Sequence, residues 1–261
     1  MSKGEIYIIS TGTGNVQQLT GNACELLGKA DLIVGYTKYI KDIESLIKDK
    51  EVYSTGMTHE VDRCKYAVGQ ALTSKKVALI SNGDANVYGM AGLVLEIIEA
   101  NNLWDKLEVI IEPGITSILT AAAKAGAPIM HDFAVISLSN LLTPMELIEK
   151  RLQNALSADF VLGLYNPLSH SRKEPYFKFL EILQQHRNGD TPVVIAQNLG
   201  RDNEAIHIKT VKDLLELKDD MTMINMSTIL IIGSSATRLA NSGKKVITRR
   251  GYQQNYDYQL Q

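Results

Sequence analysis

Short runs of aliphatic and β-branched residues alternate with longer amphipathic stretches through the first half of the chain. The apolar runs predict strands at residues 6–9, 32–34, 52–53, 77–80 and 109–111. Between them, apolar residues recur every three or four positions, which predicts helices over about 16–28 and 59–72, one ending at 98 and one ending at 124. This alternation is typical of a parallel sheet with crossover helices.

The second half of the chain has a different arrangement of apolar runs. It predicts strands at 134–136, 160–164, 193–195, 205–208 and, as the last one, 228–232. The short turn before residue 205 favours an antiparallel pair, and residues 126–128 have the Gly and Pro content of a linker. We therefore predict an α/β fold of two α/β domains with a cleft between them. Residues 1–125 form a mainly parallel sheet and residues 126–261 a mixed one, and the polar tail is expected to fray from Gln253.

Five of the predicted strands end in breaks rich in glycine or asparagine, at residues 11–15, 81–90, 112–117, 165–167 and 198–201. Ligands of α/β sheets bind at the carboxyl ends of the strands. Five such breaks exceed what packing requires, so we expect them to outline the cleft.

The first break, with Gly12, Thr13 and Gly14, does not match a dinucleotide fingerprint. The third glycine of that motif would fall at Gln17, and the acidic residue expected after the second strand is Tyr36. These departures weigh against a nicotinamide-dependent oxidoreductase. A tight turn without a ligand would also use these glycines.

The second break offers a carboxylate at Asp84, directly after Gly83, that could accept bonds from a hydroxyl or amino group. The alternative is that Asp84 caps the next helix. Thr116 and Ser117 are likewise natural caps. Thr143 and Glu146 have the spacing of a capping box, which predicts the start of a helix there.

Charge and composition exclude several classes of function. The net charge of −2 argues against a general nucleic-acid binder. No histidine, cysteine and carboxylate cluster has metal spacing, so no metal is expected. No apolar run approaches the length of a membrane span, and the apolar run after the first residues is too short for the core of a signal peptide. Both observations favour a soluble, cytoplasmic protein. His131, beside Asp132, is the histidine we consider for proton transfer, the alternative being a structural role at the domain junction.

Taken in order, the sequence resembles the tetrapyrrole methyltransferases of cobalamin biosynthesis, and in particular the group that methylates C17. The phrases that match lie at residues 34–36, 55–57, 83–84, 87–92, 112–116, 126–139, 141–144, 159–161, 165–167 and 250–252. They cover almost the whole chain, and the run from 126 to 144 is highly specific to that group.

The resemblance implies a homodimer that binds S-adenosylmethionine in the cleft and methylates C17 of precorrin-3B or cobalt-factor III with ring contraction. By position, the implied cofactor contacts are Gly83, Asp84, Val87, Thr116, Ser117, Tyr165, Asn166, Leu199 and Gly200. His131, Asp132 and Tyr36 are candidates for the proton movement that ring contraction needs. Because the substrate carries many carboxylates, we expect its binding residues to include Gly12, Thr13, Gly14, Arg172, Arg201 and Arg250.

The sequence also departs from the family pattern. Ser10 and Thr13 replace the first glycine and the proline of the usual first turn, and Arg249 takes the place of a late proline. These changes remove no reactive group, so the methyltransferase interpretation stands. Two further hypotheses remain open, another tetrapyrrole methyltransferase of the same superfamily and a non-catalytic tetrapyrrole-binding protein.

Overall fold

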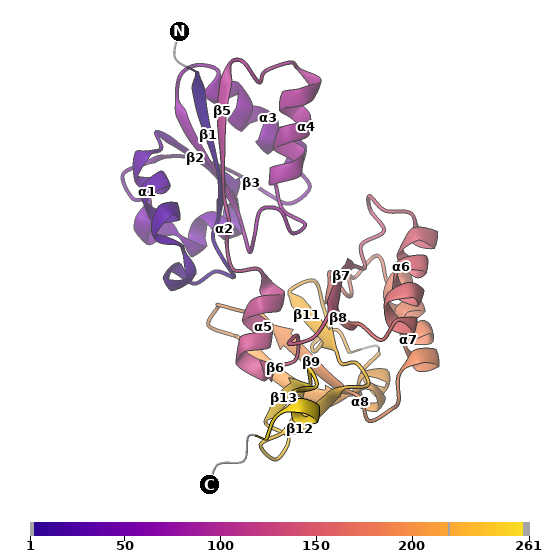
Figure 1. The fold of residues 1–261 in the computed structure, drawn as a ribbon. Helices are drawn as coiled ribbons and strands as arrows, with labels where there is room; N and C mark the ends of the chain where they lie inside the picture. Colours follow the sequence, from indigo (N-terminus) through magenta and orange to yellow (C-terminus); the bar gives the residue numbers. More distant parts are fainter. Residues whose placement is uncertain (1–2, 219, 258–261) are drawn as a thin grey trace. The chain divides into compact units, whose positions relative to one another are not determined.

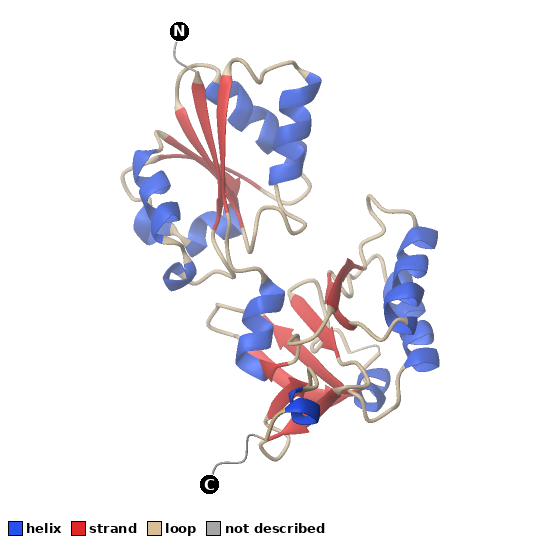
Figure 2. Ribbon diagram, in the orientation of Figure 1, coloured by secondary structure: helices blue, strands red, loops and turns tan. Residues whose placement is uncertain are grey.

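The computed structural model describes residues 3–218 and 220–257. The chain forms two compact units, Met1–Ser117 and Ile118–Gln261. Helix α5 (Ser117–Ala125) begins at this division and ends at residue 125, where the sequence predicts the domain boundary. Both units combine strands and helices along the chain, which confirms the predicted α/β class (Figure 2).

The first unit is built on a five-stranded sheet in the order β3-β2-β4-β1-β5, with every pair parallel as predicted. Its strands are β1 (Gly4–Ser10), β2 (Leu32–Tyr36), β3 (Glu51–Thr55), β4 (Lys76–Ser81) and β5 (Leu107–Glu112). Successive side chains of a strand point to opposite faces. In β1, Ile6 and Ile8 therefore join one apolar cluster, and Tyr7 and Ile9 join another on the opposite face.

Helices cover both faces of this sheet (Figure 1). Helices α3 (Glu60–Ala71) and α4 (Ala91–Ala100) pack on the Ile6 face, and α1 (Gly21–Lys29) packs on the Tyr7 face. The remaining helical segments are η1 (Val16–Gln18), α2 (Thr37–Asp42) and η2 (Glu44–Leu46). The single helix predicted over 16–28 is wrong, because Thr20 accepts a bond from the Ala23 N–H and starts α1 afresh.

The second unit has a mixed sheet in the order β10-β9-β11-β8-β7. Its strands are β7 (Phe133–Ser137), β8 (Val161–Tyr165), β9 (Pro192–Gln197), β10 (Ala205–Thr210) and β11 (Thr228–Ile232). Strands β9 and β10 pair antiparallel, as predicted, whereas β7 and β8 pair parallel.

A second, smaller sheet contains β12 (Thr237–Ala240), β13 (Lys245–Thr248) and β6 (Gly126–Ala127). The prediction that residues 228–232 form the last strand is therefore wrong. Strands of four residues with several exposed positions leave little periodic signal. The turn between them has the sequence Asn241-Ser242-Gly243, which was the indication of a hairpin available from the sequence. All three residues adopt positive φ in the structure.

The helices of this unit are α5, α6 (Met145–Ser157), α7 (Glu174–His186), α8 (Val211–Glu216) and α9 (Tyr252–Asn255). Helix α6 buries Ile148, Leu152 and Ala155, but it begins after Pro144 without a side-chain cap. The predicted capping box of Thr143 and Glu146 is therefore wrong. The expectation of a tail frayed from Gln253 is also corrected, because α9 includes that residue, while residues 258–261 lie outside the described part.

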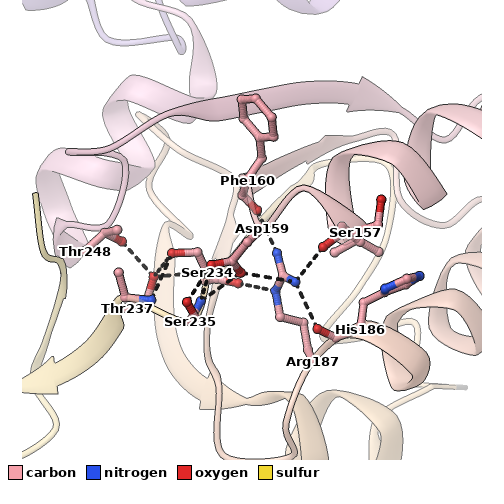
Figure 3. A network of polar contacts seen from close by, with 12 residues as sticks. Ser157, Asp159, Phe160, His186, Arg187, Ser234, Ser235, Thr237 and Thr248 are labelled. Atoms are coloured by element: carbon pink, nitrogen blue, oxygen red, sulfur yellow. Dashed lines mark hydrogen bonds and ion pairs between the residues drawn. The ribbon is translucent and has the colours of Figure 1, made fainter.

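A buried guanidinium joins three loops of the second unit (Figure 3). The side chain of Arg187, which follows α7, is 4% exposed and donates to the carbonyl oxygens of Gly233, Leu156, Phe160 and His186 at 2.8–3.0 Å. Burial lowers the pKa of this guanidinium. Because one side chain bonds four carbonyls from separate segments, Arg187 fixes the chain where α6 and α7 end.

Asp159 extends the same network (Figure 3). Its carboxylate lies 3.5 Å from Arg187 Nη1 and accepts bonds from the Ser235 N–H at 3.0 Å and the Ser235 hydroxyl at 2.5 Å. The network thereby connects the α6–β8 loop to the turn between β11 and β12.

Replacing Arg187 with methionine is expected to lower the free energy of unfolding by about 2–4 kcal/mol, because four carbonyls lose the hydrogen bonds from this side chain and the Asp159 carboxylate loses its ion-pair partner. Arg187→Lys is expected to lose nearly as much, since one ammonium cannot reach four carbonyls. Urea unfolding followed by circular dichroism measures both. The control is Arg151→Met on the exposed face of α6, expected to change stability by less than about 0.5 kcal/mol. Equal losses in the two methionine variants would contradict the proposed role of the network.

Candidate active-site loops

The loops that follow β1 and β4 are bonded to each other at the carboxyl edge of the parallel sheet. Gly12 and Gly83 exchange two backbone hydrogen bonds, at 3.1 and 2.5 Å, and Asn82 Nδ2 donates to the Gly12 carbonyl at 2.8 Å. The buried hydroxyl of Ser10 accepts from the Ala85 N–H at 2.9 Å. The two breaks that the sequence predicts as a ligand site are thus one connected structure.

Asp84 adds the loop after β5 to this structure. Its Oδ1 accepts from the Asn86 N–H at 2.8 Å, and its Oδ2 accepts from the Gly114 N–H at 3.0 Å. Helix α4 begins at Ala91 with Met90 as its N-cap, so Asp84 does not cap it. A carboxylate has more acceptor positions than these two bonds use, and the remaining ones are suited to a hydroxyl or amino donor.

The loops approach so closely at Gly114 that no side chain fits there. A Cβ on Gly114 would lie 2.5 Å from the Gly83 carbonyl oxygen and 2.6 Å from Ser10 Cβ. Gly83 itself has φ +68°, a left-handed conformation that glycine adopts without strain. The two glycines therefore allow three loops to meet at one place.

The other predicted residues of this edge are positioned around it. The N–H and hydroxyl of buried Thr13 both donate to Gln18 Oε1, at 3.0 and 2.7 Å, which fixes the turn that contains Gly14. Thr116 is buried, and its Cα would lie 3.7 Å from a Cβ on Gly83. Val87 and Ser117 are both half-buried.

Glu112, at the end of β5, is a buried carboxylate that the sequence analysis did not single out. It accepts hydrogen bonds from the Thr20 hydroxyl at 2.5 Å and from the amide of Asn22. Both donors belong to the start of α1, far away in sequence. Its position at a strand end was the only signal available.

Tyr36 ends β2 at the same edge of the sheet and precedes α2. Its ring packs edge-to-face against Tyr39, with 5.0 Å between the ring centroids.

In the second unit, Tyr165 and Asn166 end β8 beside the end of β7. The Tyr165 hydroxyl accepts from the Ile118 N–H at 3.1 Å, and Asn166, with φ 52°, donates through Nδ2 to the Ser137 hydroxyl at 2.9 Å. These bonds hold both side chains at the strand ends.

The turn after β9 contains Leu199, Gly200 and Arg201. Leu199 is buried in an apolar cluster, so only its backbone is available to a ligand. The Gly200 N–H donates to Glu204 Oε2 at 2.7 Å, and the other oxygen of Glu204 pairs with Lys124 at 2.6 Å. Although burial opposes it, these two contacts lower the pKa of Glu204. The carboxylate thus rigidifies the turn.

His131, Asp132 and Arg250 lie near one another in this unit, whereas Arg172 lies in the turn before α7. Nδ1 of the exposed His131 accepts from the Asp132 N–H at 2.7 Å and lies 3.5 Å from the Asp132 carboxylate. His131 and Arg250 both line a pocket of about 850 Å³. The structure thus brings together a catalytic candidate and a substrate-binding candidate.

Within residues 3–218 and 220–257, no three histidine, cysteine, aspartate or glutamate side chains converge as a metal-binding group. None of the helices described there is long and apolar enough to cross a membrane.

Comparison with known proteins gives a consistent result. Residues 5–215 match the model of the tetrapyrrole (corrin/porphyrin) methylases. A probable cobalt-factor III C(17)-methyltransferase of Methanocaldococcus jannaschii is 45% identical over 96% of this chain and 99% of its own length. A precorrin-3B C(17)-methyltransferase of a Sinorhizobium species is 35% identical over 90% of this chain and 91% of its own length. The crystal structure of the methyltransferase CobJ superposes with a TM-score of 0.86 at 33% identity, over 95% of this chain and all of that one.

Because Gly114 has no room for a side chain, Gly114→Ala is expected to lower the free energy of unfolding by about 1–3 kcal/mol through the forced separation of the loops. The matched control is Gly56→Ala, where nothing lies within 4 Å of the added Cβ. We expect that variant to stay within about 0.5 kcal/mol of the unaltered chain. Thermal or urea unfolding compares them, and equal stabilities would show that the loops do not pack as described.

Proposed function

Since the chain belongs to the tetrapyrrole methylase family, we propose that it transfers a methyl group from S-adenosylmethionine to C17 of cobalt-factor III or precorrin-3B, with ring contraction, in cobalamin biosynthesis. The observation that carries the proposal is the 45% identity to a probable cobalt-factor III C(17)-methyltransferase over nearly the full length of both chains. The lower identity of 35% to the precorrin-3B enzyme favours the cobalt-containing substrate. Turnover of the cobalt-loaded and metal-free compounds side by side, with product masses, tests both parts.

The residues at the sheet edge of the first unit fit the cofactor of this family. S-adenosylmethionine supplies an electrophilic methyl group, so the protein mainly has to bind, align and exclude water. Asp84 has acceptor positions left for the polar groups of the cofactor, and Gly83 leaves its backbone open to close approach. We assign Val87, Thr116 and Ser117 to the same contact surface.

In the second unit, the proposed cofactor contacts are Tyr165, Asn166, Leu199 and Gly200. The bonds from Ile118 to Tyr165 and from Asn166 to Ser137 support this assignment, because they hold polar side chains in fixed positions at strand ends. At Leu199 and Gly200 the backbone supplies the contact, since the Leu199 side chain is buried.

The acidic substrate is assigned to Arg172, Arg201 and Arg250 and to the turn formed by Gly12, Thr13 and Gly14. Guanidinium groups bind carboxylates through two parallel hydrogen bonds. Thr13 already donates to Gln18, so the turn contributes mainly shape and backbone groups.

His131, Asp132 and Tyr36 are the proposed residues for the proton movement of ring contraction. The support for His131 is its exposed position, 3.5 Å from the Asp132 carboxylate, since histidine is the side chain that most often serves as a general acid or base. A homodimeric, cytoplasmic enzyme completes the proposal: the homodimer rests on the family resemblance, and the location is the expectation drawn from the apolar pattern of the sequence.

Asp84→Asn is expected to weaken the binding of S-adenosylhomocysteine about tenfold to a hundredfold, because the amide lacks the charge that strengthens each bond from the ligand. Isothermal titration calorimetry measures the affinity, and thermal unfolding without ligand measures the stability separately. The control is Asp49→Asn, an exposed carboxylate of the same unit. Unchanged affinity at unchanged stability would remove Asp84 from the cofactor site, and no binding at ~1 mM ligand by the unaltered chain would count against the methyltransferase function.

His131→Ala is expected to leave the affinity for S-adenosylhomocysteine unchanged while slowing turnover or releasing a methylated product without the contracted ring. The solvent-exposed position of His131 makes a large loss of stability unexpected. Mass and absorbance spectra of the products distinguish the two chemical steps. Wild-type rates and products from the variant would assign His131 a structural role only.

A further inference from the structure

Two residues of the first unit have a backbone conformation that their side chains disfavour. Among residues 3–218 and 220–257, nine residues other than glycine have positive φ, and seven of these are asparagine, aspartate or serine, with short polar side chains. The other two are Thr58, at φ +66°, and Tyr88, at φ +55°. For a β-branched or bulky side chain this conformation is a true outlier, and such outliers cluster at functional sites.

Both outliers lie in loops at the carboxyl edge of the parallel sheet, the edge at which the cofactor contacts are proposed. Thr58 is in the loop that follows β3, and Tyr88 is in the loop that follows β4. The loop of Thr58 contains none of the predicted site residues, whereas the loop of Tyr88 also contains Gly83, Asp84 and Val87. Of the two strained residues, Tyr88 is therefore the one that belongs to the proposed site.

The packing of its loop holds Tyr88 in this conformation. The Ala91 N–H donates to the Ala85 carbonyl at 3.0 Å and so closes the loop around residue 88. The next residue, Gly89, is pressed against the loop and the strand end, because a Cβ there would lie 2.7 Å from both the Ala85 carbonyl oxygen and Ser81 Oγ. The backbone at Tyr88 cannot relax without breaking these contacts, which is the condition under which such strain persists.

The strain does not serve to bury the side chain, since Tyr88 is 53% exposed. A second apolar side chain, Ile115, is 39% exposed and follows Gly114, whose N–H donates to Asp84. The two loops that Asp84 joins thus each carry an exposed apolar side chain.

The distance between these two loops indicates the kind of ligand that the side chains suit. Strand β1 lies between β4 and β5, so the loops leave the sheet about 10 Å apart, at about 4.8 Å for each step between strands. A ligand that contacts both Tyr88 and Ile115 therefore has a broad apolar face. An aromatic side chain binds such a face by stacking, and a fixed backbone keeps the ring in position for it.

We propose that Tyr88 is a substrate-contacting residue of the methyl transfer, and that the strained backbone at residue 88 holds its ring against the face of the acceptor macrocycle. The identity of that acceptor rests on the proposed function. The contact would keep the acceptor carbon aligned with the methyl group of the cofactor. The consequence is a conflict at one position, where the conformation that costs folding stability is the one that binds the substrate.

The strain is tested with two variants of the full chain that both lack the ring. Tyr88→Ala keeps a Cβ in the strained conformation, whereas Tyr88→Gly removes it. At an unstrained position glycine lowers stability relative to alanine, because it gives the unfolded chain more freedom. Tyr88→Gly is nevertheless expected to melt about 2–4 °C above Tyr88→Ala. An equal or lower melting temperature of the glycine variant would overturn the strained conformation and the proposal with it.

The contact is tested by steady-state kinetics with cobalt-factor III and by calorimetry with S-adenosylhomocysteine. Both variants are expected to raise the KM for cobalt-factor III about tenfold, because a stacking contact is lost, while the affinity for S-adenosylhomocysteine changes less than about twofold. Tyr88→Phe keeps the ring, so it should recover most of the affinity that the other two variants lose. The matched control is Ser74→Gly, which relieves φ +68° at an exposed residue before β4, on the opposite edge of the sheet. We expect it to raise the melting temperature and to leave the KM unchanged.

An unchanged KM in both ring-less variants, or an equal increase in Ser74→Gly, would overturn the contact with the acceptor. A large loss of affinity for S-adenosylhomocysteine in the Tyr88 variants would overturn it as well and would assign the ring to the cofactor. If the unaltered chain methylates cobalt-factor III and the ring-less variants keep its KM, only the assignment of Tyr88 fails. If the unaltered chain neither binds S-adenosylhomocysteine nor methylates cobalt-factor III, the proposed function fails.

Discussion

Backbone polar groups at the carboxyl edge of a parallel sheet lose their ladder partners where the strands end, and they need new ones. In the first unit they bond to one another. Gly12 and Gly83 exchange a pair of backbone bonds, and Asp84 takes the N–H of Gly114. Three loops from three strands are thereby fixed as one surface, which holds Asp84 in place before any ligand arrives. Such preorganisation matters for methyl transfer, where alignment of the reacting atoms supplies much of the rate.

This constraint also explains why the altered first turn is compatible with the fold. In the family pattern the turn has a glycine and a proline where this chain has Ser10 and Thr13. A proline restricts the backbone and removes an N–H donor. Here the Thr13 N–H and hydroxyl both donate to Gln18, and the Ser10 hydroxyl accepts from Ala85. Hydrogen bonds have taken over the restriction that the proline would supply.

The sequence predicted those features that depend on local patterns. Continuous apolar strands such as β1 and β4 predicted a sheet buried on both faces, and the glycine-containing breaks indicated the edge of the sheet that carries the proposed cofactor site. The helix start at Thr20 was missed because its cap interrupts an apolar period that otherwise runs through it. The bond between Asp84 and Gly114 joins residues 30 positions apart, so neither composition nor periodicity contains it. Without that contact, a capping role for Asp84 was an equally reasonable interpretation.

The net charge of the chain does not show how its charged side chains are distributed over the surface. The chain has 27 basic and 29 acidic residues, and this balance predicts no affinity for an acidic ligand. A sum over the chain, however, does not depend on which side chains lie on the same face. The register between β12 and β13, two strands of four residues each, pairs Arg238 with Ile247. Arg249 lies two positions after Ile247 and on the same face, whereas the buried side chain of Thr248 lies on the other face. A shift of β12 by one residue in that register would move Arg238 to the face opposite Ile247 and Arg249. The local positive field of the pocket beside this hairpin therefore depends on the pairing of two short strands that the sequence pattern did not reveal.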